Sequence, residues 1–242
     1  QGAKTVVLDA DFGLRNLDLL LGLENRIVYD LVNVIEGKCK TNQAMIKDKH
    51  DHELYLIPAA QTRDKNSVEP EQLRELCAEL ENDFDYVLID CPAGIEQGFK
   101  NATAAAHEAI IVTTPEVSAI RDADRVIGLL ESAGLHRPKL IINRIAPDMV
   151  KRGDMMDQKD VENLLAVDVI GLVPADENTV VAANRGVPVV HDRKSGAGAA
   201  FMRIAARVDG EDIPLENLEP KTGLFSRFKE LVGMNGRAYS HA

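Results

Sequence analysis

The sequence contains no tryptophan, and aromatic residues make up only 4% of its 242 residues, although hydrophobic residues make up 45%. A core of that size must therefore be built from Val, Ile, Leu and Ala. This composition suits an α/β protein with buried parallel strands better than a β-sandwich.

Cysteine and positive charge are also scarce. Cys39, Cys77 and Cys91 are far apart and form no Cys-x-x-Cys pair, which argues against a disulfide framework or a zinc site and predicts a reduced, cytoplasmic setting. The formal net charge of −11 argues against general nucleic-acid binding, so no nucleic-acid partner is expected. No signal peptide is recognisable, and no apolar run is long enough to cross a bilayer.

Short apolar runs rich in β-branched residues alternate with helical patterns, such as residues 70–80 and 117–132. The second pattern places Ile120, Ile127 and Leu130 on one face. This alternation predicts an α/β fold with a doubly wound, mainly parallel sheet and helices on both faces. The runs expected to form strands are residues 4–8, 53–58, 86–89, 109–113, 139–142 and 169–173.

The composition divides the chain into four parts. Residues 1–208 carry the α/β pattern and are expected to form one domain. Residues 209–220 are acidic and contain two prolines, so they read as a tether. A basic and apolar segment follows over residues 221–233, and residues 234–242 form a polar tail.

Acidic residues close two of the predicted strands. Asp9 and Asp11 stand at positions i and i+2 after the first strand, and Asp90 follows the apolar run 86–89. Ligands of doubly wound folds sit at the carboxyl ends of the strands, where one carboxylate can order Mg²⁺ and its waters while another positions a nucleophilic water. Asp90 is typical of a Walker B strand, and Gly94 in the turn after it lets the backbone approach a phosphate. The alternative for Asp9 and Asp11 is a polar turn with an Asx cap, and the alternative for Asp90 is an ordinary aspartate between strand and loop.

Two further strand ends carry polar residues. Asn143 follows the run 139–142, and Pro174 and Asp176 follow the run 169–173. Amide and carboxylate groups at neighbouring strand ends can read the edge of a purine. The alternative is that these residues only cap the helices that follow.

These motifs come in an order and spacing that resembles the MinD family of septum site-determining ATPases, a deviant Walker A group of P-loop proteins. The longest matching stretch is Asp-Ala-Asp-Phe-Gly-Leu-Arg-Asn-Leu-Asp-Leu-Leu-Leu-Gly at residues 9–22, together with the strand 4–8 before it. The resemblance covers nearly all of residues 1–232. Further matching segments are residues 28–37, 46–49, 57–65, 90–96, 115–118, 121–125, 152–155 and 186–188.

The resemblance implies ATP and Mg²⁺ as cofactors and a role for each strand end. Asp11 would orient the hydrolytic water in an ATP-bound homodimer, and Asp9 would be its partner near the magnesium shell. Asp90 would be the Walker B carboxylate, so Asp90 and Asp9 would hold Mg²⁺, partly through water. Asn143, together with Pro174 and Asp176 at the end of the last strand, would contact the base of the nucleotide.

The resemblance also implies protein partners. Ser118, Asp122 and Asp124 lie on the helix that the family offers to its division inhibitor and its topological activator, here a MinC-like and a MinE-like protein. Charge pattern alone would favour an ordinary solvated helix face. The implied function is spatial, because the ATPase would cycle between cytoplasm and inner membrane and place the inhibitor so that the septum forms at mid-cell.

The phosphate-binding motif Gly-x-x-x-x-Gly-Lys-[Ser/Thr] does not occur in the sequence. In the family a strand, this loop and most of a helix precede the region matched here, roughly 30 residues in all. Their absence predicts unpaired edges on the neighbouring strands and exposed apolar surface where the helix would pack. The intact protein is expected to be an ATP hydrolase, whereas these 242 residues alone should bind ATP poorly.

The segment 221–233 has the pattern of an amphipathic, membrane-targeting helix that would hold the protein peripherally on anionic lipids of the inner membrane. Its apolar residues share one arc, and the basic residues flank that arc, where they can reach lipid headgroups. One copy binds weakly, so a dimer would be needed for firm attachment. The alternative is a helix docked on the protein's own core. The residues concerned are Leu224, Phe225, Arg227, Phe228, Lys229, Leu231 and Val232.

Two other functions remain open. One is a chromosome- or plasmid-partition ATPase of the same fold, which would be expected to carry a basic DNA-binding surface. The other is a non-catalytic scaffold that recruits partners to the membrane without hydrolysing ATP. The intact Asp11 and Asp90 argue against the scaffold.

Overall fold

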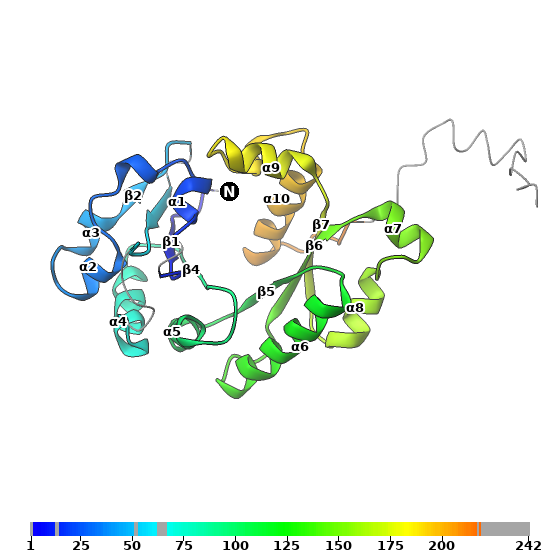
Figure 1. Cartoon of the computed structure of the whole chain (residues 1–242), viewed down its shortest axis with the longest axis horizontal. Coiled ribbons are helices and arrows are strands. Elements are labelled where there is room, and N and C mark those ends of the chain that lie inside the picture. The colour runs from blue at the N-terminus through cyan, green and yellow to red at the C-terminus, as the bar shows by residue number, and fades with distance from the viewer. Residues whose placement is uncertain (1, 13–14, 51–52, 62–66, 217, 219–242) are drawn as a thin grey trace, which may run out of the picture.

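The computed structural model describes residues 2–12, 15–50, 53–61, 67–216 and 218. It is an α/β protein whose helices cover both faces of two mainly parallel sheets (Figure 1). The six runs predicted to form strands all do so, and a further two-residue strand was not predicted. The strands are β1 (Thr5–Asp9), β2 (Ile46–Lys47), β3 (Leu54–Ile57), β4 (Tyr86–Asp90), β5 (Ile110–Thr113), β6 (Lys139–Ile145) and β7 (Val169–Pro174).

One sheet has the strand order β2-β3-β1-β4 and the other has the order β5-β6-β7. All described pairings are parallel except that of β2 with β3. Among the described residues, β4 pairs only with β1 and β5 pairs only with β6, so each has one unpaired edge. The described strands therefore form two sheets, with the unpaired edges that the sequence analysis predicts.

The helices lie between and after these strands. Short 3₁₀ turns, η1 (Glu24–Arg26) and η2 (Val189–His191), occur in two of the connections. The α-helices are α1 (Leu17–Leu20), α2 (Leu31–Ile35), α3 (Thr41–Ala44), α4 (Pro70–Leu80), α5 (Gln97–Ala105), α6 (Val117–Ser132), α7 (Pro147–Arg152), α8 (Gln158–Leu165), α9 (Glu177–Asn184) and α10 (Gly196–Val208).

The first core lies between β1 and α4. The helix begins with Pro70, whose fixed φ suits the first helical position. Its buried residues, among them Leu73 and Leu80, recur at helical spacing and belong to one cluster with Val6 and Leu8 of β1. Since every second residue of β1 faces this cluster, the strand is fixed in register against the helix.

The second core lies between α6 and β6. The predicted apolar face of α6 is confirmed, because Ile120, Ile127 and Leu130 are buried in one cluster with Leu140 and Ile142 of β6. On the other face of this sheet, β6 and β7 pack against α10 through a separate cluster of small and aliphatic residues.

Two further contacts join the halves of the molecule. Gly22 and Gly186 both have positive φ, and a Cβ on either would lie within 2.8 Å of the other's backbone. At the start of β4, the Tyr86 hydroxyl donates to Oδ1 of Asp209 at 2.8 Å. These contacts hold α1 beside α9 and β4 near the end of α10 (Figure 1).

The chain after α10 is anchored by Arg207. Its guanidinium donates to the carbonyl oxygens of Ile170, Ile213 and Pro214 at 2.7–2.9 Å. Leu215 packs against the second core. The first part of the predicted tether therefore lies on the domain surface, and the proposed boundary after residue 208 stays a prediction.

Among the helices that the structure describes, none combines the length and the apolar character needed to cross a bilayer. The segment predicted to bind lipid, residues 221–233, lies outside the described residues.

We predict that Gly171→Ala destabilises the protein. A Cβ at Gly171 in β7 would lie 2.3 Å from both Cγ1 and Cδ1 of Ile204, a core residue of α10, so the packing must shift. Overpacking of this kind typically costs about 1–3 kcal/mol of the free energy of unfolding. Urea denaturation of the variant and of the unsubstituted chain measures this difference in the free energy of unfolding.

The matched control is Gly128→Ala in α6, where a new Cβ meets no atom within 4 Å. Alanine is favoured over glycine in a helix by roughly 0.5–1 kcal/mol, so this variant should be slightly more stable. A Gly171→Ala protein as stable as the unsubstituted chain would contradict the packing described.

Candidate functional site

The ends of β1 and β4 bring two of the predicted site residues together. Asp9 and Asp90 are direct partners in the parallel register, and the N–H of Ala10 donates to the carbonyl oxygen of Asp90 at 3.0 Å. The two carboxyl groups therefore stand side by side at the same edge of the sheet. Asp11, two residues beyond Asp9, completes a group of three carboxylates whose charges act on one another.

Asp9 is the most constrained of the three, with a side chain only 1% exposed. Its Oδ1 accepts a hydrogen bond from the N–H of Asp11 at 3.0 Å, whereas its Oδ2 is buried without a hydrogen-bond partner among the described residues. Burial raises the pKa of Asp9 to about 6, although the hydrogen bond from the N–H of Asp11 lowers it. The negative charge of Asp90 raises the pKa further. Among the described residues, the site thus holds a buried carboxylate oxygen without a hydrogen-bond partner.

Asp90 lies beside Asp9 but is more exposed to solvent. Desolvation raises the pKa of its carboxyl group, and the negative charge of Asp11 raises it further. Repulsion among neighbouring carboxylates is relieved by a bound cation. The donor set fits Mg²⁺, which is usually held by one or two carboxylates together with waters and phosphate oxygens. In the described part of the chain, no group of three or more His, Cys, Asp or Glu side chains forms a ready-made metal cage.

An ion pair that the sequence analysis did not identify follows the carboxylates. Nε of Arg15 lies 3.0 Å from Oδ2 of Asp18, and both side chains are largely buried. Removing one partner of a buried pair leaves an uncompensated charge, so the pair fixes the beginning of α1 firmly. The signal available in the sequence was the i, i+3 spacing of opposite charges.

The loop after Asp90 is positioned by a second glycine that was not predicted. A Cβ on Gly98, in the first turn of α5, would lie 2.3 Å from Cγ of Pro92. Only glycine lets the helix approach the loop so closely. Gly94 has a φ of +97°, and no atom lies within 4 Å of the position of its missing Cβ. The backbone at Gly94 is therefore not covered by neighbouring atoms, and its contact with a phosphate stays a prediction.

The residues expected at the base are largely engaged by the chain itself. Oδ1 of Asn143 accepts a hydrogen bond from the N–H of Arg144 at 2.8 Å. Oδ2 of Asp176 accepts from the Ser195 hydroxyl at 2.6 Å and from the Ala197 N–H at 3.1 Å, which lowers the pKa of Asp176. Asp176 thus ties the start of α9 to the start of α10, and its contact with a base stays a prediction, as does that of Pro174 beside it.

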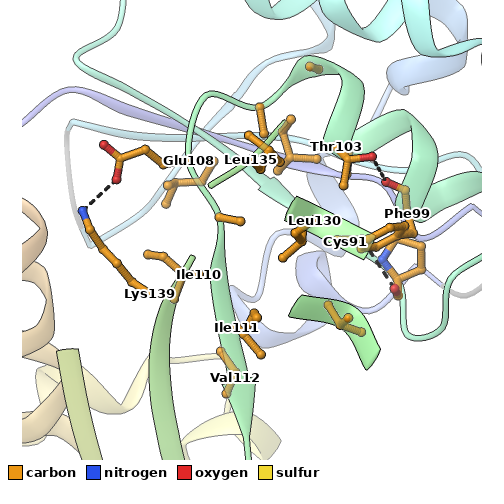
Figure 2. A pocket seen from close by; sticks show the side chains of 18 of the residues that line it. Cys91, Phe99, Thr103, Glu108, Ile110, Ile111, Val112, Leu130, Leu135 and Lys139 are labelled. Carbon is orange, nitrogen blue, oxygen red and sulfur yellow. Dashed lines mark hydrogen bonds and ion pairs between the residues drawn. The ribbon is translucent and has the colours of Figure 1, made fainter. Parts of the chain in front are cut away.

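A cavity of about 1080 Å³ lies between β4 and β5. Figure 2 shows Ile110, Ile111 and Val112 of β5 along one side of it. Gly94, Asn143 and Asp122 also line the cavity, whereas Pro174 and Asp176 do not. The structure therefore brings part of the predicted nucleotide site to this cavity and leaves the end of β7 outside it.

The residues predicted to meet protein partners lie on α6. Ser118, Asp122 and Asp124 are all exposed, whereas the opposite face of the helix is buried in the second core. Their exposure is compatible with a docking surface and with a solvated face alike, so the partner-binding role stays a prediction.

Comparison with known proteins shows the family to which the chain belongs. Residues 1–140 match a family model described as an AAA domain. The septum site-determining protein MinD of Bacillus subtilis is 50% identical over 236 residues, which cover 96% of this chain and 88% of that protein. MinD in the MinC:MinD cell division protein complex of Aquifex aeolicus is 45% identical with a TM-score of 0.84, covering 90% of this chain and 88% of that one.

A more distant structure, MinD of Pyrococcus horikoshii complexed with Mg-ADP, is 28% identical with a TM-score of 0.77 and covers 86% of this chain and 84% of that one. The fold and these relatives define a P-loop NTPase-like α/β protein. The chain belongs to the MinD family of septum site-determining proteins.

We predict that Asp9 makes the free energy of unfolding depend on pH. The pKa of Asp9 is about 6 in the folded protein and about 3.9 in an unfolded chain, so the folded state binds more protons between these values. Stability therefore falls as pH rises from about 4 to 6, by about 3 kcal/mol when the effect is complete. Thermal unfolding of the wild-type chain and of Asp9→Asn across this range measures the difference.

Asp9→Asn should lose this part of the pH dependence, so that the variant gains stability relative to wild type as pH rises. Asp124→Asn on the exposed face of α6 is the control and should follow the wild-type curve. Parallel curves for Asp9→Asn and wild type would show that Asp9 ionises normally in the folded protein.

Proposed function

We propose that this chain serves a membrane-associated ATPase cycle that places the division septum, with the carboxylates at the ends of β1 and β4 as its chemical centre. The observation that carries this proposal is the pairing of Asp9 with Asp90, which sets a buried, uncompensated carboxylate beside a more accessible one. A family relative complexed with Mg-ADP supports the same use of the site.

Each carboxylate has a distinct role in this proposal. Asp90 and Asp9 would hold Mg²⁺, partly through water, and the ion would neutralise phosphate charge. Asp11 lies two residues beyond the buried Asp9 and is only partly buried. Its carboxylate can therefore orient an attacking water. Gly94 offers an open backbone position to the phosphates.

The phosphate cradle itself is not part of these 242 residues, because no Gly-x-x-x-x-Gly-Lys-[Ser/Thr] motif occurs in them. Backbone N–H groups of such a loop provide most of the binding to the β- and γ-phosphates. Tight nucleotide binding is therefore proposed only together with a strand–loop–helix segment that carries this motif.

The proposed partners follow from the relatives. The solved MinC:MinD complex supports a MinC-like division inhibitor as one partner, with Ser118, Asp122 and Asp124 of α6 as its contact residues. ATP-dependent homodimerisation, a MinE-like activator and anionic lipids of the inner membrane complete the proposal. The lipid contact is assigned to residues 224–232, which lie outside the described residues.

A non-catalytic scaffold is the second candidate, since no Gly-x-x-x-x-Gly-Lys-[Ser/Thr] motif occurs in these 242 residues. In that case the chain would bring partners to the membrane without an ATP-controlled step.

Co-sedimentation with anionic liposomes distinguishes the two. The 242-residue chain is compared with a version extended at its N-terminus by a strand–loop–helix segment carrying the Gly-rich motif. We expect only the extended form to pellet, and only with ATP, because paired lipid-binding helices require an ATP-dependent dimer. If neither form responds to ATP, the ATPase cycle is wrong and the scaffold takes its place.

We predict that Asp11→Asn in the extended form lowers kcat for ATP hydrolysis by about 10²-fold or more, since a positioned catalytic carboxylate contributes about 10²–10⁴-fold. ATP-dependent pelleting should persist, because Asp11 acts on the water rather than on the bound nucleotide. Asp124→Asn is the control for hydrolysis. Unchanged hydrolysis by Asp11→Asn would remove Asp11 from the mechanism.

A further inference from the structure

The segment that follows α10, residues 209–216, is held on the domain although its acidic composition is typical of a tether. Arg207, in the last turn of α10, donates from Nε to the carbonyl oxygen of Ile213 at 2.8 Å and from Nη2 to that of Pro214 at 2.7 Å. Its Nη1 donates to the carbonyl oxygen of Ile170 in β7 at 2.9 Å. One guanidinium therefore ties the segment to its own helix and to the edge of the second sheet.

Contacts at both ends complete the attachment of this segment, which we call the strap. At its beginning, Oδ1 of Asp209 accepts a hydrogen bond from the Tyr86 hydroxyl at 2.8 Å. At its end, Glu216 forms an ion pair with Arg203 of α10. The strap is thus held at its first residue, in its middle and at its last residue.

The strap carries the chain from one face of the second sheet to the other. Val208, just before it, packs against the cluster between the sheet and α10. Leu215 and Leu218 pack instead against the second core, which lies on the opposite face together with α6 and α8. This crossing gives the strap an apolar anchor in addition to its polar contacts.

The crossing takes place at the end of the molecule opposite the carboxylates. Tyr86 is the first residue of β4 and Asp90 is its last, and Ile170 is the second residue of β7. At about 3.3 Å per residue, the four steps from Tyr86 to Asp90 separate the strap from the carboxylates by on the order of 13 Å. The chain therefore leaves the domain far from the candidate site.

We propose that Arg207 is a positioning residue, which holds the strap and so fixes the point from which the lipid-binding segment, residues 221–233, leaves the domain. The inference rests on the proposed function, in which two such segments of a dimer bind lipid together. A free tether would comprise the twelve residues 209–220, whereas a held strap leaves only the four residues 217–220. Effective concentration falls roughly as the −3/2 power of tether length, so releasing the strap would lower it by up to about fivefold.

Hydrogen exchange of the 242-residue chain tests the strap in the absence of nucleotide and lipid. Arg207→Gln removes the three guanidinium contacts, so exchange at the amides of residues 209–216 should become about tenfold faster or more. Arg207→Lys should behave in the same way, because a single ammonium group does not reproduce the planar fork that reaches three carbonyl oxygens. Arg193→Gln is the matched control, since Arg193 is exposed and lies outside the strap, and it should exchange as the wild type does.

A second variant keeps the test decisive if Arg207→Gln does not fold. Leu215→Asn removes the apolar anchor of the strap and leaves α10 unchanged. Exchange over residues 209–216 should again become faster, whereas exchange within α10 should stay that of the wild type.

Co-sedimentation with liposomes of phosphatidylglycerol and phosphatidylcholine in equal parts tests the consequence for lipid binding. It uses the extended form with ATP, and compares wild type, Arg207→Gln and Arg193→Gln. The lipid concentration for half-maximal pelleting should rise by about two- to fivefold for Arg207→Gln alone. ATP hydrolysis without lipid should be the same in all three, because the strap lies far from the carboxylates.

Two outcomes would overturn the inference. Equal exchange over residues 209–216 in wild type and Arg207→Gln would show that Arg207 does not hold the strap. Faster exchange with an unchanged lipid midpoint would show that the strap does not control membrane attachment. Absence of lipid binding in wild type and variants alike would refute the proposed function instead, and the exchange measurement would still decide whether Arg207 holds the strap.

Discussion

The hydrogen-bonded pairing of β1 with β4 is the interaction on which the candidate site depends. Five residues of each strand are in register, and the last pair is Asp9 with Asp90. Because the register is fixed by the packing of alternate β1 residues against α4, the two carboxylates cannot separate without disrupting the core. Their mutual repulsion, and the raised pKa of Asp9, are therefore built into the sheet. A bound cation would relieve this repulsion.

The same requirement for backbone pairing explains the most unusual feature of the molecule. A parallel sheet of this kind is stable when its inner strands are paired on both edges and covered on both faces. Among the residues that the structure describes, β4 and β5 are each paired on one edge, and Leu88 and Val112 are exposed. The halves are instead joined by contacts at the periphery, such as that between Gly22 and Gly186.

Several site residues serve the fold as well as the proposed chemistry. Asp176, expected at the base, holds the starts of α9 and α10 together through Ser195 and Ala197. Gly98 and Pro92 hold the loop after Asp90 against α5. Such residues keep the strand ends in position, so that the carboxylates act from a rigid edge of the sheet.

The sequence by itself determined the strands, the long helices and the family, because apolar periodicity and the order of the motifs are local properties. It also indicated that Asp9, Asp11 and Asp90 belong to one site. Only the tertiary structure decided that Asp9 is buried with an unpartnered oxygen and a pKa of about 6, since burial depends on segments distant in the chain. The Arg15–Asp18 pair and the close approach of Gly98 to Pro92 were likewise decided by packing.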